Sequence, residues 1–554
     1  MTVGNVAATG HAGRPSREGD DAAAPADQLP ALGHGANVSS APAQTAPPVY
    51  PDKIDGAVLK IAGVVVLGAI MSILDITVVN VALPTFQVVF GEPGDPLPYS
   101  TVAWTVTAYT LALATVIPMT GWAADRFGTK RLYMTALLLF TLGSTLCAMA
   151  TSIGMLIGFR ALQGLGGGML MPLGMTIMTR AAGPARMGRL MAILGVPMLL
   201  GPIFGPILGG YLIDNYSWHW IFLINVPIGA AAIIYSWRVL AADRPQPSES
   251  FDWVGMALMS PGLALFLYGI SSIPGEGTFF SPKVIIPGTI GLLMVAGFVF
   301  WSFKPKHPLL DLRLFKNRNL TVSVITMFLF VAAFFGGLLL VPTYFQEVRG
   351  ESTLQAGLLV APQGIGAMIT MPIAGSQVDK RPIGQIVPFG LVGILIGMFG
   401  LTQLTATTPY PVIIAELFVM GLGMGATMMP LFTSALKTLK AHEVARGSTL
   451  LNINQQIASS CGVAIMSVIL TNHLQASKLA GPAMATLHIP SLADKINPIA
   501  IAKGLEDAAS AFADTYWVAW SMVLLTVIPA LFLPRKREET HLLDDEDIPP
   551  VVVH

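Results

Sequence analysis

The chain has 554 residues, of which 53% are hydrophobic and only 11% are charged. Soluble domains carry about 25% charged residues, so this composition excludes an ordinary soluble protein and indicates a chain that lies largely within a membrane. Lys and Arg together number 31, as do Asp and Glu, and this balance argues against a nucleic-acid-binding protein.

The chain begins with a segment unlike the rest. Residues 1–52 are rich in Ala, Pro, Gly and Ser and contain no apolar run, so we expect a disordered tail and not a cleavable signal peptide.

Fourteen apolar segments follow, each close to the roughly 20 residues that a helix needs to cross a bilayer. A second tail, residues 536–554, is acidic. The approximate cores of the expected spans are residues 57–83, 101–122, 131–150, 153–179, 189–213, 219–239, 253–272, 284–303, 320–343, 355–376, 385–404, 410–433, 448–472 and 515–533.

Basic residues are distributed unevenly between the two sides that these spans define. With the N-terminus placed in the cytoplasm, 25 of the 31 Lys and Arg residues fall on the cytoplasmic side, 5 fall on the outer side, and Arg160 falls within a span. Cytoplasmic loops of membrane proteins carry an excess of Lys and Arg. We therefore expect both termini in the cytoplasm, which requires an even number of spans.

The connection between the second and third spans, Pro118 to Arg131, returns later in the chain. Other repeated motifs relate spans one to six to spans nine to fourteen, whereas spans seven and eight have no counterpart. The sequence therefore predicts two related six-span halves, residues 53–240 and 320–535, joined by residues 241–319 with two extra spans. In the repeated connection, Pro118, Gly121, Asp125 and Arg126 have counterparts 254 residues later at Pro372, Gly375, Asp379 and Lys380.

This connection also carries a family resemblance. Its G-x-x-A-D-R-x-G-x-K-R pattern resembles the loop between spans two and three in the major facilitator superfamily, and the two extra spans resemble its fourteen-span branch of drug:proton antiporters. The resemblance implies an all-α membrane protein with two six-helix bundles and two extra central spans. It also implies that the loop lies on the cytoplasmic side and helps to lock the outward-facing state. The residues of this conformational latch would be Gly121, Asp125, Arg126, Gly128, Lys130, Arg131 and, in the second half, Asp379.

The first span contains an acidic residue, Asp75. A carboxylate is costly in hydrocarbon, so we expect it to face the interior of the bundle or water. The run Leu74 to Pro84 resembles the L-D-x-T-V-V-N-V-A-L-P signature of the drug:proton antiporters, and this resemblance implies that Asp75 couples transport to protons or binds a cation. The alternative is a structural aspartate tied to a neighbouring helix.

The fourth span contains a basic residue, Arg160. A guanidinium at mid-span costs about 2.5–3.5 kcal/mol unless it is paired, so we expect an acidic partner. Asp75 is the first choice, and Glu416 in the twelfth span is either the partner or a second protonation site. The R-x-x-Q-G-x-G pattern that starts at Arg160 resembles the span-four motif of the superfamily, in which the arginine is linked to proton transfer. The glycines are not a phosphate cradle, because no G-K-[ST] follows them.

Glycine and proline are concentrated in the fifth span. Such a span is expected to bend and to have one face with few side chains, which lets another helix backbone approach closely. The pattern resembles the antiporter motif of exporters in the superfamily, which implies export and not import. The residues of the motif are Gly195, Gly201, Pro202, Gly205, Pro206, Gly209 and Gly210.

Polar and aromatic residues in several spans are candidates for lining a substrate cavity. Met420 and Met424 lie on one face of the twelfth span, and methionine stripes suit adaptable binding surfaces, although plain packing gives the same pattern. Trp104 and Tyr109 in the second span are either ligand contacts or interface anchors. The full set of candidates is Trp104, Tyr109, Gln163, Phe334, Met420, Met424, Asn452 and Gln456.

The resemblance covers about residues 57–535 and implies a proton-coupled exporter of amphiphilic drugs or toxic compounds in the plasma membrane, which is the inner membrane of a bacterium. The expected partners are small amphiphilic substrates, protons and the lipid bilayer, with no nucleic acid, no nucleotide and any accessory protein unidentified. We expect no enzymatic activity, no cofactor and no metal site, because both cysteines, Cys147 and Cys461, lie in apolar runs and no His/Cys/Asp cluster appears. Two alternatives remain, a dedicated exporter of a lipid, siderophore or metabolite, and a non-transporting membrane receptor or scaffold.

Overall fold

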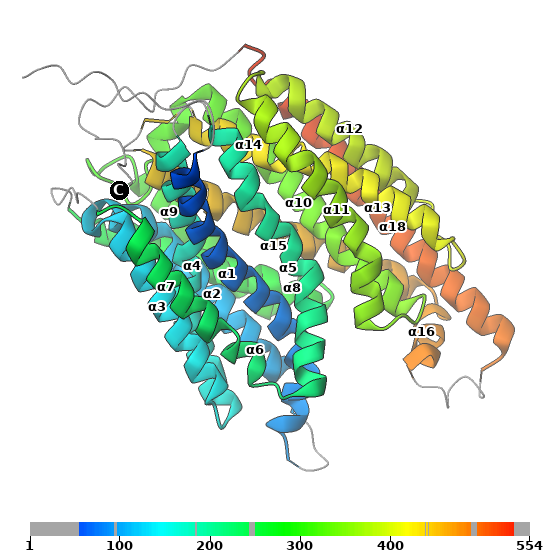
Figure 1. Cartoon of the computed structure of the whole chain (residues 1–554). Helices are drawn as coiled ribbons and strands as arrows, with labels where there is room; N and C mark the ends of the chain where they lie inside the picture. The colour runs from blue at the N-terminus through cyan, green and yellow to red at the C-terminus, as the bar shows by residue number, and fades with distance from the viewer. Residues whose placement is uncertain are drawn as a thin grey trace, which may run out of the picture. The chain divides into compact units, whose positions relative to one another are not determined.

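The structure, a computed structural model, describes residues 55–92, 97–182, 186–242, 250–437, 439–440, 443–488 and 496–536. The predicted N-terminal tail, residues 1–52, and nearly all of the predicted C-terminal tail, residues 536–554, lie outside the described residues. The elements within the described ranges are helices (Figure 1). The all-α fold expected from the apolar segments is therefore confirmed.

The first half of the chain folds into the helices α1 to α7. Asp55 begins the first helix by accepting a hydrogen bond from the backbone N–H of Val58, as an N-cap residue does. The predicted sixth span is divided at Ile224 into a short helix and a longer one. The bounds are α1 (Gly56–Val89), α2 (Tyr99–Phe127), α3 (Thr129–Ala148), α4 (Ile153–Ala182), α5 (Met187–Asn215), α6 (Trp220–Leu223) and α7 (Asn225–Val239).

The rest of the chain supplies the extra pair and the second half. The predicted twelfth span is divided between Gly425 and Met428 into two helices that meet at a break. The extra pair is α8 (Trp253–Glu276) and α9 (Pro282–Trp301), and a 3-10 helix, η1 (Leu312–Lys316), leads into the second half. That half comprises α10 (Arg318–Glu347), α11 (Thr353–Val378), α12 (Ile383–Leu401), α13 (Tyr410–Gly425), α14 (Met428–Lys437), α15 (Val444–Ala476), α16 (Ala480–His488) and α18 (Pro498–Ala530).

Thirteen helical segments in the described part of the chain are long and apolar enough to cross a bilayer. They include the α6–α7 and α13–α14 pairs, each counted as one segment. α5 has 29 residues, which gives a length of about 43 Å at 1.5 Å per residue and exceeds the roughly 30 Å of a bilayer's hydrocarbon core. α5 is thus long enough to be the fourteenth span.

The two six-span halves meet through equivalent helices. α2 of the first half packs on α15 of the second, and α5 packs on α11. α2 and α5 are the second and fifth spans of their half, whereas α11 and α15 are the second and fifth spans of theirs. The contacts between the halves therefore follow the sequence repeat.

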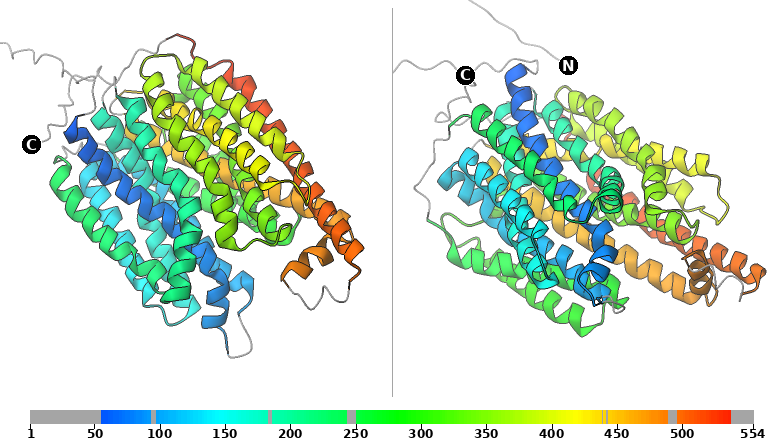
Figure 2. Two further views of the ribbon diagram at one scale, coloured as in Figure 1. Left: turned by 45° about the vertical axis from the view of Figure 1, so that its right-hand side comes forward. Right: turned by 60° about the horizontal axis from the view of Figure 1, so that its bottom comes forward.

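The extra pair α8–α9 covers one of these two seams. α8 packs on both α2 and α15, and Figure 2 shows the green pair along one side of the bundle. Trp104 of α2 stacks on Tyr268 of α8 with ring centroids 5.5 Å apart. Ile117 of α2, Leu263 of α8 and Ile453 of α15 belong to one buried apolar cluster. The pair is thus tied to both halves at the α2–α15 seam.

The two ends of the bundle are named here after their connections. The α2–α3 end holds the start of α1, the α2–α3 connection and the starts of α5, α12 and α15. The α1–α2 end holds the opposite connections, including those before α4 and α13.

Candidate functional site

Asp75 of α1 and Arg160 of α4 form an ion pair inside the first half. Arg160 Nη1 lies 2.5 Å from Asp75 Oδ2, and neither side chain is exposed. The structure thus brings together the two charges that the sequence places alone in apolar spans. Removing one member of such a buried pair typically costs about 3–5 kcal/mol, because the other charge is left without compensation.

Both oxygens of Asp75 have hydrogen-bond donors. Gln163 Nε2 donates to Asp75 Oδ1 over 2.8 Å, and Asn225 Nδ2 donates to the same oxygen over 3.3 Å. Gln163 also accepts from Arg160 Nη1 over 2.7 Å, and Arg160 Nε donates to the backbone oxygen of Thr105 over 3.0 Å. Arg160, Gln163 and Asn225 all donate to Asp75. An ionised carboxylate only accepts hydrogen bonds, so the arrangement suits that form.

Tyr109 of α2 covers one face of Arg160. The guanidinium carbon lies 4.2 Å from the ring centroid, which is the geometry of a cation–π contact. The Tyr109 hydroxyl lies 3.2 Å from Ser72 Oγ of α1. Arg160 Nη2 is buried and has no hydrogen-bond partner among the described residues. The contact with the ring therefore offsets part of the free energy lost when this nitrogen is removed from water.

Asn225 is a member of this network that the sequence does not single out. It is buried at the start of α7, and its Nδ2 also lies 3.1 Å from Ser144 Oγ of α3. Ser144 in turn donates to the backbone oxygen of Phe222 over 2.9 Å. The available signal is a lone amide within the apolar run Trp218 to Gly229, since a polar group inside a span needs a partner.

A glycine face of α5 holds α1 at the turn that carries Asp75. A Cβ added at Gly201 would lie 2.1 Å from Ile73 Cγ2, and one at Gly205 would lie 2.0 Å from Thr77 Oγ1. Ile73 and Thr77 lie on either side of Asp75. Asp75 is therefore positioned by glycines of α5 as well as by its polar partners on α4 and α7.

The other residues of the predicted antiporter motif have separate surroundings. A Cβ at Gly209 would lie 3.1 Å from Val78 of α1, which continues the same face. Gly195 faces the second half, where a Cβ would lie 2.7 Å from Met371 Sδ of α11. Gly210 has open space, with no atom within 4 Å of an added Cβ. The side chains of Pro202 and Pro206 lie outside those that the structure describes.

At the α2–α3 end, Asp125 of α2 faces basic residues from both halves. Its carboxylate oxygens lie 3.6 Å from Arg180 Nη2 of α4 and 3.9 Å from Arg446 Nε of α15. Gly121 lies one turn earlier, and a Cβ there would be 3.1 Å from Thr449 Oγ1 of α15. The predicted latch residues Gly121 and Asp125 thus lie at a contact between the halves.

Other predicted latch residues lie within the first half. Lys130 Nζ donates to the backbone oxygens of Trp237, over 2.8 Å, and of Leu240, so it holds the end of α7 and does not bridge to the second half through these bonds. Gly128 links α2 to α3 with a φ of +92°, a conformation that favours glycine. Arg126 lies in the last turn of α2, and Arg131 is exposed in the first turn of α3.

Asp379, the C-cap residue of α11, makes the equivalent contact with α5. Its Oδ1 accepts from the backbone N–H of Gly188 over 2.9 Å, and its Oδ2 accepts from Arg189 Nε over 3.1 Å. Gly188 is the second residue of α5, so the carboxylate lies at the positive end of that helix. Gly188 and Gly375 meet backbone to backbone. Burial raises the pKa of Asp379 above its ordinary value, although the hydrogen bonds from Gly188 and Arg189 oppose the rise.

Glu416 of α13 lies in the second half. Its side chain packs against Gly400 of α12, where an added Cβ would be 2.1 Å from Glu416 Oε1. Its Oε2 is buried and has no hydrogen-bond partner among the described residues. The alternative pairing of Arg160 with Glu416 is therefore wrong in this structure, because the acidic partner of Arg160 is Asp75.

The predicted cavity residues fall into two groups. Tyr109 and Gln163 are buried within the Asp75 network. Phe334, Met420 and Met424 are also buried, and all three belong to the main apolar core. The two methionines of α13 are thus packed in the apolar core in this conformation.

The remaining candidates lie closer to a seam or a surface. Trp104 is 41% exposed, although one ring face stacks on Tyr268 of the extra pair. Asn452 of α15 reaches the first half, where its Nδ2 lies 3.4 Å from Met175 Sδ of α4. Gln456, one turn further along α15, is half-buried. Asn452 and Gln456 therefore lie on a helix that meets the first half.

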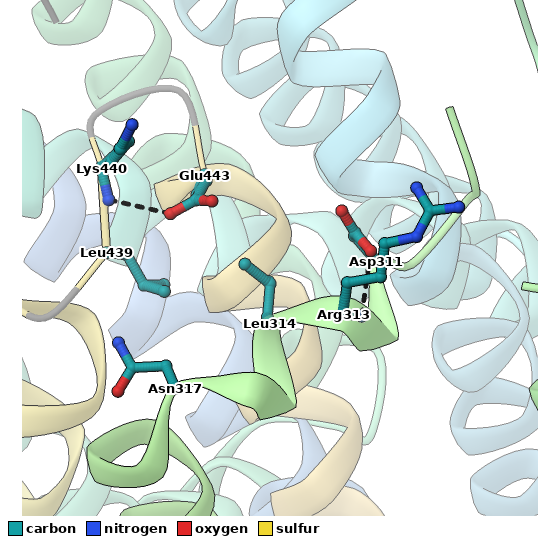
Figure 3. A pocket seen from close by; sticks show the side chains of 7 residues that line it. All are labelled: Asp311, Arg313, Leu314, Asn317, Leu439, Lys440 and Glu443. Atoms are coloured by element: carbon teal, nitrogen blue, oxygen red, sulfur yellow. Dashed lines mark hydrogen bonds between the residues drawn. The ribbon is translucent and has the colours of Figure 1, made fainter. Parts of the chain in front are cut away.

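A separate cavity of about 320 Å³ lies at the α2–α3 end (Figure 3). Its lining comes from η1 and its flanks on one side and from the approach to α15 on the other. The backbone N–H of Lys440 donates to Glu443 Oε2 over 3.0 Å, and that of Arg313 donates to Asp311 Oδ1 over 3.0 Å. None of the lining residues is a predicted site residue. They are Asp311, Arg313, Leu314, Asn317, Leu439, Lys440 and Glu443.

These features define a membrane transport protein built from two related bundles. The family model described as Major Facilitator Superfamily matches residues 65–463, and the chain belongs to this superfamily. It is a multi-pass transporter and not an enzyme, as the sequence predicts.

Named relatives support a more particular likeness. The chain is 45% identical over 504 residues to the multidrug resistance protein B homolog of Mycobacterium tuberculosis (strain H37Rv), covering 88% of this chain and 92% of that one. It is 31% identical over 455 residues to the multidrug export protein EmrB of Escherichia coli (strain K12), covering 80% and 84% respectively. Among solved structures, the proton:xylose symporter XylE superposes with a TM-score of 0.55 at 16% identity, covering 88% of this chain and 98% of that one, which is a likeness of fold alone.

Proposed function

We propose that this protein is a proton-coupled antiporter that exports amphiphilic drugs or other toxic compounds across the plasma membrane. The observation that carries the proposal is the buried Asp75–Arg160 pair, because a membrane protein retains such charges at a cost and uses them for coupling. The relatives named multidrug resistance protein B homolog and multidrug export protein EmrB support a drug-like substrate class.

The proposal includes an orientation. With the α2–α3 end in the cytoplasm, 25 of the 31 Lys and Arg residues lie on the cytoplasmic side, in agreement with the positive-inside rule. The contacts of Asp125 with Arg446 and of Asp379 with Gly188 then close the cytoplasmic end. The conformation described above would be outward-facing, with both termini in the cytoplasm.

In this cycle Asp75 carries the proton. The outward-facing state holds Asp75 ionised among donors, ready to accept a proton from outside. Protonation removes the negative charge and weakens the pairing with Arg160, so α1 and α4 can shift relative to each other. Return to the inward-facing state releases the proton to the cytoplasm and admits substrate. Asp125 and Asp379 act as latches that must break in each cycle.

The energy available is sufficient for export. One elementary charge that moves through 100 mV is worth about 2.3 kcal/mol, and each tenfold concentration ratio costs about 1.4 kcal/mol. One electrogenic proton thus supports a ratio of roughly forty-fold.

The test is proton release that depends on substrate. Inverted vesicles that contain the protein would be energised and exposed to a panel of amphiphilic compounds while lumenal pH is recorded. The proposal expects alkalinisation of the lumen with several chemically unrelated compounds. Flux with a single compound that blocks all others would point to a dedicated exporter, and no flux with any compound would point to a receptor or scaffold.

A further inference from the structure

A groove of about 430 Å³ lies between α11 and α12 near the α2–α3 end of the second half. Both helices pack on α13, so α13 forms a shared floor. Ala426 contributes to the lining where the floor breaks between α13 and α14. The walls include Ile373 from α11 and Pro388 and Phe389 from α12, so the interior is mainly apolar.

The groove opens away from the first half. Gly375 marks the face of α11 that contacts α5. Ile373 and Gln377 lie two residues to either side of Gly375, which places them about 160° around the helix from it. Ile373 is 56% exposed and Phe389 is 80% exposed. In a membrane-spanning bundle these side chains face lipid, so the groove is accessible from the bilayer and not from the seam between the halves.

One end of the groove is polar and basic. Gln377, Arg381 and Gln385 contribute to the lining there, and Arg381 is exposed beside Lys380. The nearest acidic residue along the chain, Asp379, already accepts hydrogen bonds from α5. An anionic group at the mouth would therefore meet positive charge.

The end of the chain adds further positive charge at the same place. The backbone N–H of Gly384 donates to the oxygen of Pro534 over 3.0 Å, so the segment after α18 lies against the start of α12. Arg535 and Lys536 follow directly and are exposed. α12 itself begins after Pro382, and the positive end of the helix dipole adds to the field, although the Gly384 N–H is bonded to Pro534.

We infer that this groove binds a phospholipid with an anionic head group. The acyl chain would lie along Ile373 and Phe389, and the phosphate would lie at Arg381 and the start of α12. Apolar space joined to a basic mouth at one end of a bundle is the combination that selects anionic lipids. A cationic amphiphile would be repelled by the same mouth. With the orientation proposed above, the lipid comes from the cytoplasmic leaflet, but binding itself does not depend on transport.

The test measures lipid binding to the full-length protein by native mass spectrometry. Phosphatidylglycerol and phosphatidylcholine with identical acyl chains would be titrated separately. We expect phosphatidylglycerol to bind more tightly, and Arg381→Ala to weaken its binding about fivefold, which corresponds to about 1 kcal/mol for one basic residue. Ile373→Trp should reduce the binding of both lipids by filling the apolar part.

The matched control is Arg238→Ala, which removes an exposed basic residue at the same end of the first half. It should leave lipid binding unchanged. Equal affinity for the two lipids, or equal effects of Arg381→Ala and Arg238→Ala, would overturn the inference. A chain truncated after Lys536 tests another occupant, because residues 538–547 include Glu538 and Asp544 and are acidic. If phosphatidylglycerol binds only after truncation, the tail is the occupant and the inference is wrong.

Discussion

The two halves use the same helix contact to bring their fourth and second spans together. In the first half, a Cβ at Gly164 of α4 would lie 2.4 Å from the backbone oxygen of Tyr109 in α2. In the second half, a Cβ at Gly421 of α13 would lie 1.9 Å from the backbone oxygen of Gln363 in α11. The scaffold of the repeat is therefore a set of close glycine contacts, which need no charged residue.

The halves differ one turn before these glycines. Arg160 precedes Gly164 by four residues and is bound to Asp75, whereas Leu417 precedes Gly421 by four residues and joins the apolar core. Both positions are fully buried. Since the second half folds with leucine at this position, the charged network of the first half is not needed for the bundle to form. The difference is therefore consistent with the proposed role of the network in coupling, which variants of either half can test.

The largest effect is expected from Arg160→Ala. The change leaves Asp75 buried without its counter-charge and should lower the free energy of unfolding by about 3–5 kcal/mol. It should also abolish proton-driven transport. Thermal unfolding of the purified protein, followed by tryptophan fluorescence, measures the first effect.

Two controls separate charge from packing. Leu417→Ala should cost about 2–5 kcal/mol through its cavity alone and should keep proton-driven transport in the molecules that fold. The double variant Asp75→Asn with Arg160→Ala should recover part of the stability lost in Arg160→Ala, since it removes the unpaired charge. A double variant no more stable than Arg160→Ala would contradict a net electrostatic penalty.

A smaller effect is expected from Gly205→Val. The added side chain would collide with Thr77 and push α1 away from α5, at a cost of about 1–3 kcal/mol. Because Thr77 lies two residues from Asp75, coupling should suffer more than passive exchange of substrate. Gly210→Ala is the matched control in the same helix, since an added Cβ there meets open space and should change stability by less than about 0.5 kcal/mol. Equal effects of the two variants would argue against a positioning role for α5.

A pH effect is expected at the latches. Burial raises the pKa of Asp379 above its ordinary value of 3.8 in the closed α2–α3 end, and opening would expose the carboxyl. The closed end therefore binds a proton more readily than an open one. Proton binding therefore stabilises the closed end relative to the open end. This stabilisation is complete below about pH 4 and is lost as the pH rises through the raised pKa of Asp379. Distances between spin labels at Arg238 and Lys440, both exposed at this end, would show more of the closed state in acid.

Asp379→Asn should remove this pH dependence, since it cannot ionise. Asp125→Asn should keep it, because Asp125 is more exposed and its ion pairs are longer, at 3.6 and 3.9 Å. Pairs of that kind contribute about 0–1 kcal/mol, so this variant should slow transport without abolishing substrate binding. If the pH dependence is lost in Asp125→Asn and kept in Asp379→Asn, the titrating latch residue is Asp125 and not Asp379.

The smallest effect is expected from Glu416→Gln. Glu416 Oε2 has no hydrogen-bond partner among the described residues, so the amide should change stability by less than about 0.5 kcal/mol. Uphill transport in vesicles should remain within about twofold of the unaltered protein. Loss of uphill transport would give the second half its own protonation site and would weaken the contrast between the halves.

Much of the architecture could be predicted from the sequence because apolar length and glycine pattern are local properties. Asp75 and Arg160 could be paired because two lone charges in apolar spans need each other. The same reasoning could not show which face of α4 meets which neighbour, so it did not predict the hydrogen bond between Gln163 and Asp75. The place of Gln163 in a substrate cavity stays a prediction. Lys130 is predicted to be a latch residue, and that role stays a prediction; its bond to Trp237 at the end of α7 depends on tertiary packing that the motif does not show.

Other features depend on contacts that no pattern carries. Asn225 joins the network only because α6 and α7 bring it beside Asp75. The break between α13 and α14 lies at Ala426 and Thr427, neither of which is a proline. The apolar run therefore contains no local signal that predicts the break. Both features arise from packing between segments that are distant in the chain.

Asp75→Asn is the direct test of whether Asp75 carries the coupling proton. Asparagine keeps the volume and one acceptor but cannot carry a proton, and Gln163 and Arg160 remain to hold it. The measurement is proton-driven accumulation of an amphiphilic substrate in inverted vesicles, with expression and thermal stability checked alongside. We expect accumulation against a gradient to be lost while downhill exchange persists. Uphill accumulation that survives in Asp75→Asn would show that another residue carries the coupling proton.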